Sequence, residues 1–380
     1  MAGGENPLTK QPVQKQKQPT QHPLFGISTR HWIALVKQNK GIDQRFLHRA
    51  LFITLTSLCT APVRMVFKIK YDKKINRQNL SHPPIFIIGH WRSGTTYLHE
   101  LVSRDPQFCT TSLWDTLLPE GGLLLQPLKR FLALFLPSER PMDAIRVDID
   151  GPYEDEAGLA VLLPWSFFHC LHFPRNADEQ YSKSVHFQGL SSKQKNQWKE
   201  AYVTFIKMVV FSSKGKQFLS KNPANTARIS TLLEVFPDAR FIHIYRSPYL
   251  VYLSTRKMRL RVLDKLALQE ASEETIETQV IQNYIRLMNS FFEQQPLIPK
   301  DRFVEVCYED LTRDPIGQVT RIYETLKLPG LDNALPEMKK YLSEQKEYKT
   351  NVYAMDEKIV EQVDRHWKFT VDRWRYPPPM

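Results

Sequence analysis

The sequence predicts an α/β protein with a P-loop-like three-layer fold, in which helices flank a central, mostly parallel sheet. Two observations carry this prediction. Short apolar runs rich in Ile, Val and Phe recur along the chain, and longer stretches with helical periodicity follow them. The first run, PPIFIIGH at residues 83–90, leads into a glycine-bearing loop and then a helix, which is the order that opens an α/β unit.

The elements expected after this loop continue the alternation of strands and helices. The Leu-rich stretches at 120–175 are interrupted by prolines, so we expect them to wrap a site instead of joining the sheet. In chain order, the sequence predicts a helix at 95–102, a helix within 191–218, a strand at 217–220, a helix ending at 235, a strand at 239–246, helices at 248–263 and 270–294, a strand running into a loop at 302–311, and a helix at 315–326.

Charge and cysteine content narrow the class of protein. The chain has 52 Lys and Arg against 40 Asp and Glu, a net charge of +12. This excess favours an anionic ligand, an anionic membrane surface or nucleic acid, and does not choose among them. The four cysteines lie far apart and form no CxxC pair, so we expect reduced thiols in a cytoplasmic protein, without a zinc site or a disulfide framework.

The chain is expected to divide into a tail, an extension and one domain. Residues 1–27 are rich in Gln, Lys and Pro and lack the apolar core of a signal peptide, so they predict a disordered basic tail. Residues 28–82 predict a helical N-terminal extension, and residues 83–380 a single domain.

An apolar stretch within the extension, residues 50–67, raises the question of a membrane. A spanning helix needs about 20 uninterrupted apolar residues, whereas Pro62 and Arg64 interrupt this stretch. We therefore expect a buried helix. The alternative is an interfacial helix flanked by basic residues, which would give peripheral membrane contact through residues 45–70.

The loop at 89–96, GHWRSGTT, has the features of a phosphate cradle. Its glycines let several backbone N–H groups face one point, the following helix adds partial positive charge, and Thr95 and Thr96 add hydroxyl donors. The nucleotide-triphosphatase loop reads GxxxxGK[ST], but here Thr95 stands in place of the Lys and Arg92 supplies the cation. A small-molecule kinase is therefore disfavoured and is kept as an alternative.

The longer stretch HWRSGTTYLHELVSRDP resembles the 5′-phosphosulfate loop of the PAPS-dependent sulfotransferases, where PAPS is 3′-phosphoadenosine 5′-phosphosulfate. It is most similar to the branch with Arg in the loop, which includes tyrosylprotein and many bacterial sulfotransferases. The resemblance implies that residues 83–380 are a sulfotransferase domain, and that Arg92, Ser93, Gly94, Thr95 and Thr96 bind the donor. It also implies transfer of a sulfuryl group to a hydroxyl or amine with release of PAP, the 3′,5′-bisphosphate product.

Two further segments resemble the family's nucleotide contacts. The family binds the 3′-phosphate with an Arg at a strand end and a Ser on the next helix, and FPDARFIHIYRSPYLVYLS offers Arg246 and Ser254. By the same resemblance, Lys349 is a late basic contact to the nucleotide. Lys221, in KNPANTARI, has two possible roles that stay open: it faces the donor phosphates, or it pairs with a surface carboxylate.

Sulfuryl transfer resembles phosphoryl transfer in placing charge on the leaving oxygen, a charge that Arg92 would stabilise as a catalytic residue. No metal is expected, because no metal-ligand spacing occurs. The acceptor needs a base, for which we select Glu154, since Pro152–Glu156 resembles a Pro-x-Glu-Asp-Glu run of bacterial members. The alternatives are Glu156, Asp115, His90 and His99.

The sequence does not determine the chemical class of the acceptor. A lipid, a glycan and a small alcohol or phenol all fit the aromatic content of the proline-broken region, and we expect no nucleic-acid partner. Besides the kinase, a non-enzymatic protein that binds anions or a membrane through a degenerate loop is kept as an alternative. Stabilisation by PAP without magnesium would separate the three.

Overall fold

A computed structural model of the chain describes residues 22–134, 147–345 and 355–379. The sheet has five strands in the order β2-β3-β1-β4-β5, and every pair of neighbours is parallel. The strands are β1 (Ile85–Ile88), β2 (Phe108–Cys109), β3 (Gln217–Lys221), β4 (Arg240–Tyr245) and β5 (Phe303–Cys307). The predicted α/β fold with a parallel sheet is confirmed. The two-residue strand β2 was not predicted, because so short a segment has no periodicity.

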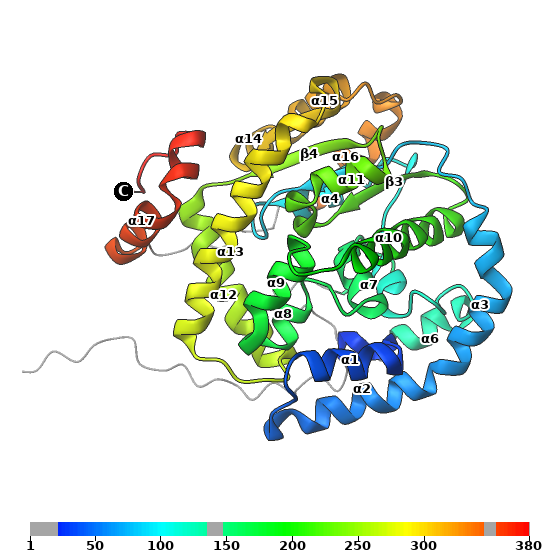
Figure 1. Cartoon of the computed structure of the whole chain (residues 1–380). Helices are drawn as coiled ribbons and strands as arrows, with labels where there is room; N and C mark the ends of the chain where they lie inside the picture. The colour runs from blue at the N-terminus through cyan, green and yellow to red at the C-terminus, as the bar shows by residue number, and fades with distance from the viewer. Residues whose placement is uncertain (1–21, 135–146, 346–354, 380) are drawn as a thin grey trace, which may run out of the picture.

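Helices cover both faces of the sheet, as Figure 1 shows. The helices are α1 (Thr29–Gln38), α2 (Leu47–Cys59), α3 (Ala61–Asn76), α4 (Thr95–Val102), α5 (Leu113–Leu117), α6 (Lys129–Ala133), α7 (Asp155–Leu162), α8 (His169–His172), α9 (Ala177–Val185), α10 (Ser192–Ser212), α11 (Ile229–Val235), α12 (Pro248–Leu266), α13 (Glu273–Gln294), α14 (Tyr308–Arg313), α15 (Pro315–Thr325), α16 (Leu331–Glu344) and α17 (Glu357–Trp374). Two short 3-10 helices, η1 (Pro23–Gly26) and η5 (Pro223–Ala227), also bear on the site.

Alternation along β1 explains the three layers. Phe86 and Ile88 pack with α10, α11 and α13, whereas Ile85 and Ile87 pack with α4, α15 and α16. All four side chains are fully buried. A strand that is apolar on both faces needs cover on both sides, which is the condition for a buried parallel sheet.

The N-terminal segment is packed against the body of the protein. Leu24 and Ile27 are fully buried, and the His22 ring lies 3.0 Å from the carbonyl oxygen of Leu266. Residues 22–27 are therefore ordered, so the boundary of the expected disordered tail at residue 27 is wrong; its residues 1–21 lie outside the described part of the chain. Residues 28–82 contain the expected helices.

The apolar stretch at 50–67 falls on α2 and α3. In the described ranges no single helix is long and apolar enough to cross a membrane. Residues 44–59 and 61–76 meet the length and composition criteria only together, and a bend of 41° separates them.

Candidate functional site

The carboxyl ends of β3, β1 and β4 lie side by side, so the loops after these strands meet at one edge of the sheet. The loop after β1 is tied to both neighbours. The Gly89 N–H donates to Thr226 Oγ1 of η5 at 2.8 Å, and the Ser93 hydroxyl lies 3.0 Å from the Ile244 carbonyl of β4. Ligands of open α/β sheets bind at such an edge, where the chain turns from one side of a central strand to the other.

The backbone of this loop adopts conformations that require specific residues. Gly94 has φ +98°, and a Cβ at this position would lie 2.1 Å from Cδ2 of Tyr308. Arg92 has φ +70°, a left-handed conformation that costs an L-residue about 1–2 kcal/mol. Strain of this kind clusters at ligand clamps and active sites. The loop therefore holds Arg92 in a defined position at the expense of local stability.

The loop ends at the N-terminus of α4, where Thr95 and Thr96 form the first turn and Gly94 is the cap. The first N–H groups of a helix have no intrahelical acceptor and carry partial positive charge, so they attract an anion. Thr95 is buried and Thr96 is half-buried. The Ser93 hydroxyl points inward to the carbonyls of His90 and Ile244, so the Ser93 side chain holds the loop in shape.

The structure brings Arg246 and Ser254 to this loop. Ser254, buried on α12, accepts a hydrogen bond from Arg92 Nε at 2.9 Å. Arg246 follows β4 directly, and its guanidinium lies 4.4 Å from the centre of the Tyr308 ring. Within the described residues, the buried Nε of Arg246 has no hydrogen-bond partner. An arginine with an unused donor beside a helix N-terminus is a candidate anion site.

Tyr308 is a residue of the site that the sequence reasoning missed. Its ring packs against Gly94 and also lies under Arg246, so it touches both halves of the anion site. Its position directly after β5 is the signal that could have found it, because the residue after each parallel strand reaches the same edge of the sheet.

The acidic run at 154–156 lies at the start of α7. Glu154 caps this helix, and its Oε1 lies 2.8 Å from Nζ of Lys221, the last residue of β3. Lys221 thus pairs with a carboxylate, as one of the two interpretations expected, but the partner is Glu154 in a largely buried pair and not a surface carboxylate. Lys221 is buried, and the Glu154 side chain is 15 % exposed.

Asp155 and Glu156 face the interior. Asp155 accepts hydrogen bonds from Thr111, Tyr202 and Ser220, and burial raises its pKa to about 6. Both oxygens of Glu156 are occupied, by Arg228, by the side chain of Asn222 and by the backbone N–H of Phe167. Burial alone would raise the pKa of Glu156, but the Arg228 guanidinium lowers it overall. Because none of its oxygens is left for an acceptor, this arrangement argues against Glu156 as the base.

The other base candidates are also held by local contacts. Asp115 accepts from the backbone and hydroxyl of Ser112 in a capping box on α5, and burial raises its pKa. The buried His90 ring lies 2.6 Å from the Trp91 carbonyl, and desolvation lowers its pKa to about 4, so it is neutral at physiological pH. His99 is buried on α4. Lys349 lies outside the described residues.

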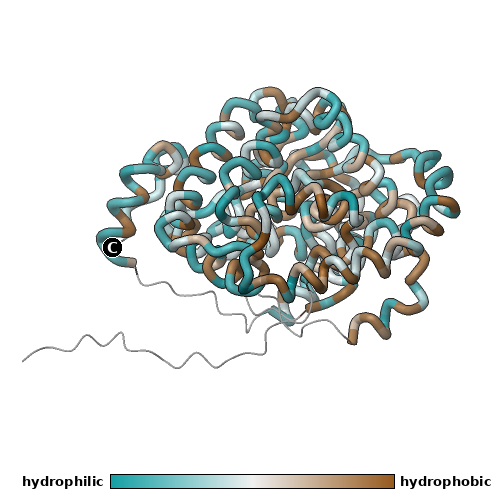
Figure 2. Tube along the Cα trace, turned by 60° about the horizontal axis from the view of Figure 1, so that its bottom comes forward, coloured by the Kyte–Doolittle hydropathy of each residue, from teal (hydrophilic) through white to brown (hydrophobic). Residues whose placement is uncertain are grey.

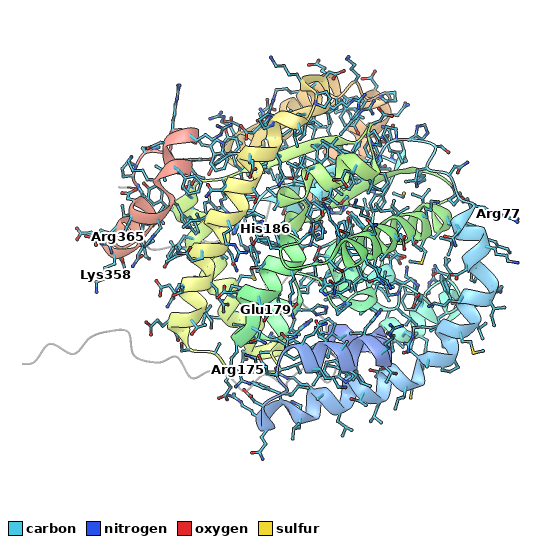
Figure 3. The ribbon with its side chains drawn as sticks, in the orientation of Figure 1. Arg77, Arg175, Glu179, His186, Lys358 and Arg365 are labelled. Carbon is cyan, nitrogen blue, oxygen red and sulfur yellow. The ribbon has the colours of Figure 1, made fainter. Side chains whose placement is uncertain are left out.

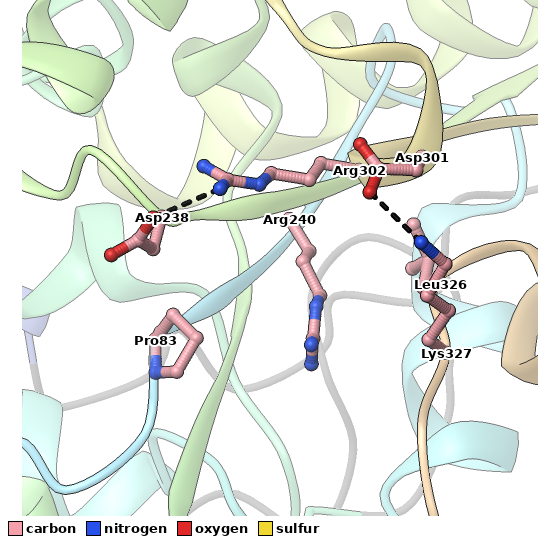
Figure 4. A pocket seen from close by; sticks show the side chains of 7 residues that line it. All are labelled: Pro83, Asp238, Arg240, Asp301, Arg302, Leu326 and Lys327. Atoms are coloured by element: carbon pink, nitrogen blue, oxygen red, sulfur yellow. Dashed lines mark hydrogen bonds and ion pairs between the residues drawn. The ribbon is translucent and has the colours of Figure 1, made fainter.

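A separate pocket of about 330 Å³ opens where the strands begin, at the edge opposite to the loop (Figure 4). Its charges largely pair with one another: Arg302 with Asp238 at 3.0 Å, and Lys327 with Asp301 at 3.1 Å. This pocket is therefore not part of the anion site. Across the described ranges, no group of three or more His, Cys, Asp or Glu side chains is placed to hold a metal ion.

An all-parallel sheet with two arginines and a helix N-terminus at its carboxyl edge is the architecture of a P-loop-like, phosphate-binding enzyme. The chain belongs to the sulfotransferase family, whose pattern matches residues 83–333. The prediction of a sulfotransferase enzyme is thus confirmed, against the kinase and the non-enzymatic alternatives.

Curated relatives and solved structures from mycobacteria are similar to this chain. The chain is 32% identical over 356 residues to the omega-hydroxy-beta-dihydromenaquinone-9 sulfotransferase Stf3 of Mycobacterium bovis and of Mycobacterium tuberculosis, an alignment that covers 93% of this chain and 91% of the relative. Its fold is similar to those of sulfotransferase STF9 from Mycobacterium avium (TM-score 0.68, 17% identity, 92% of this chain and 96% of the other) and STF1 from M. tuberculosis H37Rv (TM-score 0.62, 17% identity, 88% and 91%).

Proposed function

We propose that this enzyme uses PAPS as its donor, in the manner of the Arg-loop branch, and transfers the sulfuryl group to a hydroxyl of a lipid-like acceptor. The observation that carries the donor assignment is the hydrogen bond from Arg92 to Ser254. It joins the loop expected to bind the 5′-phosphosulfate to the helix expected to bind the 3′-phosphate. A site for two anionic groups at a fixed separation suits PAPS better than a nucleotide with one terminal phosphate chain.

The residues present fit this donor. The unused Nε of Arg246 and the first turn of α4 offer hydrogen bonds to anionic oxygens at two places. When bound, PAPS supplies an activated sulfuryl group. Arg92 would then stabilise the negative charge that develops on the leaving phosphate, a role in which preorganised donors have the largest effect.

Glu154 is our choice of base. Among the described residues only its Oε1 is engaged, by Lys221, whereas Asp155 and Glu156 are fully buried and bonded on both oxygens. The ion pair orients the carboxylate, and the second oxygen is left to accept the proton of the acceptor hydroxyl. Glu154→Gln should lower kcat about 10²–10⁴-fold with little change in the affinity for PAP. An unchanged kcat would remove Glu154 from the mechanism.

A lipid-like acceptor is supported by the relatives and by the apolar residues beside the loop. Stf3, which is named for a hydroxylated menaquinone, is similar over nearly the whole chain. Trp91, in the loop itself, stacks on Phe167 at 3.8 Å between ring centres. Both rings line a small cavity of mixed character, with Met258 and Val280 on its apolar side and His90, Thr255, Arg259 and Asn283 on its polar side. The aromatic and apolar part of this lining suits a hydrophobic acceptor with a polar head better than a sugar.

Thermal stabilisation tests the donor. PAP should raise the melting temperature without magnesium, and ADP with magnesium should raise it much less. Equal stabilisation by ADP would contradict the proposal. Labelled PAPS with a prenyl-chain alcohol, a simple phenol and a sugar then tests the acceptor, and preferred labelling of the phenol or the sugar would refute the lipid-like class alone.

A further inference from the structure

The outer surface of α2 and α3 is unusually apolar. Seven large hydrophobic side chains, each between 51% and 76% exposed, form what we call the α2–α3 face: Leu47, Leu51, Leu55, Leu58, Met65, Val66 and Ile69. The four leucines follow a spacing of four, four and three residues, so they line one side of α2. Figure 2, in which the bottom of Figure 1 comes forward, shows hydrophobic positions along these outer helices. A contiguous exposed apolar patch of this kind marks an interaction site.

The two arginines within this region do not interrupt the face, because both turn inward. Arg49 donates to the carbonyls of Ala267 and Asp264, each at 2.7 Å. Arg64 donates to the carbonyls of Ser57 and Gly26 at 2.8 and 3.2 Å. Both side chains are less than 10 % exposed. From residue 46 to residue 67, therefore, no Asp, Glu, Lys or Arg residue is more than 9% exposed.

Basic residues cluster at the α3 end of the apolar face. Lys68, Lys70, Lys73, Lys74 and Arg77 are all exposed along the second half of α3, and Figure 3 shows Arg77 at the far end of this helix. Residues 28–82 contain eleven Lys and Arg against two Asp. An apolar helix face beside a cluster of lysines is complementary to a membrane with anionic headgroups.

We propose that the α2–α3 face lies in the plane of an anionic membrane interface, with its leucines among the acyl chains and the lysines of α3 at the headgroups. The face lies on the membrane and does not cross it, because the opposite sides of both helices are packed on the protein: Ile53, Phe67 and Ile75 are buried. The bend of 41° between the two segments likewise suits a curved surface helix better than a span.

The membrane face adjoins the acceptor side of the site. Val63 of α3 packs against the loop at Gly121, and α6 lies between α3 and α7 in Figure 1. Phe131 and Leu134, at the end of α6, add two more exposed apolar side chains, at 59% and 78% exposure. An acceptor dissolved in the bilayer would thus approach Glu154 from this side, a consequence that rests on the proposed function, whereas membrane binding itself does not.

Vesicle flotation of the full chain tests the proposal. The protein should float with vesicles of phosphatidylcholine and phosphatidylglycerol, bind phosphatidylcholine alone more weakly, and be released by salt. Leu51→Gln, Leu55→Gln and Leu58→Gln together should weaken binding at least about tenfold, and Lys73→Gln with Lys74→Gln about 25-fold, at roughly fivefold for each charge.

Matched controls lie elsewhere on the surface. Leu297→Gln removes a leucine that is 56% exposed, compared with 60% for Leu51, and Lys358→Gln with Arg365→Gln removes two exposed charges from α17. Neither control should change flotation. The triple leucine variant should keep the PAP-induced rise in melting temperature, which separates a failure of membrane binding from a failure of the donor assignment.

Four outcomes would overturn the proposal. The first is that the wild-type protein does not float with anionic vesicles. The second is that the controls weaken binding as much as the face variants do, and the third is that release from vesicles requires detergent, as for a spanning helix. The fourth is an oligomer in lipid-free solution that the triple leucine variant dissociates, because a second copy of the chain would then cover the face.

Discussion

Gly94→Ala should damage the anion site through two separate effects. At φ +98° an alanine is strained by about 1–2 kcal/mol, and its Cβ would lie 2.1 Å from the Tyr308 ring. Overpacking of this kind typically costs about 1–3 kcal/mol. The two costs together, about 2–5 kcal/mol, destabilise the loop that positions Arg92 and the start of α4. Since about 1.4 kcal/mol is tenfold in affinity, PAP binding should weaken by about 30-fold or more.

Isothermal titration with PAP and urea unfolding would measure the two costs. Gly41→Ala is the matched control, because Gly41 has φ +93° but no atom within 4 Å of an added Cβ. It should lower the free energy of unfolding by about 1–2 kcal/mol and leave PAP affinity unchanged. The double variant Gly94→Ala/Tyr308→Ala should bind PAP better than Gly94→Ala does. If Gly94→Ala kept PAP affinity within twofold of wild type, the packing of Tyr308 against the loop would not control the site.

Three further predictions concern buried polar groups. Arg228→Ala should lower the free energy of unfolding by about 3–5 kcal/mol, because Glu156 loses its ion-pair partner and is left as a buried charge. Urea unfolding should show a smaller loss for the double variant Arg228→Met/Glu156→Gln. Equal losses for the two variants would contradict the argument. Asp155 has a pKa of about 6 in the folded protein against 3.8 as its ordinary value, so its share of stability, about 3 kcal/mol, is present below pH 4 and lost as pH rises through 6. Asp155→Asn should flatten the measured dependence of unfolding free energy between pH 4 and 6, and an unchanged slope would rule out this assignment. Ser254→Ala, which removes the acceptor of Arg92 Nε, should weaken PAP binding about tenfold with little change in melting temperature; wild-type affinity in titration would argue against a role for this hydrogen bond.

The sequence predicted the parts of the structure that depend on local patterns. The strands at 85–88 and 240–245 and the helix beginning at Thr95 were expected almost residue by residue, because both faces of the strands are apolar and glycines mark the loop between strand and helix. The all-parallel sheet then follows from the alternation of strands and helices. The resemblance to the sulfotransferase family, and not these patterns alone, assigned Arg92 and Arg246 to one site.

The sequence could not predict contacts that depend on tertiary packing. Lys221 and Glu154 are far apart in the chain, and only the packing of α7 beside β3 brings them within 2.8 Å. Similarly, Arg64 was expected to interrupt an apolar segment, whereas its side chain turns toward backbone carbonyls of the N-terminal region. The direction of a long side chain depends on which neighbours offer acceptors, and composition alone does not contain that information.

Arg92 donates to Ser254, and Arg246 lies over the Tyr308 ring that packs against Gly94, so each cationic centre has neighbours that hold it before any ligand arrives. For a ligand with an anionic group at each end, the first contact therefore raises the effective concentration of the second group at its own site. A ligand with only one such group gains none of this. If PAPS is the donor, as proposed, the enzyme would therefore discriminate between nucleotides by the distance between their phosphates.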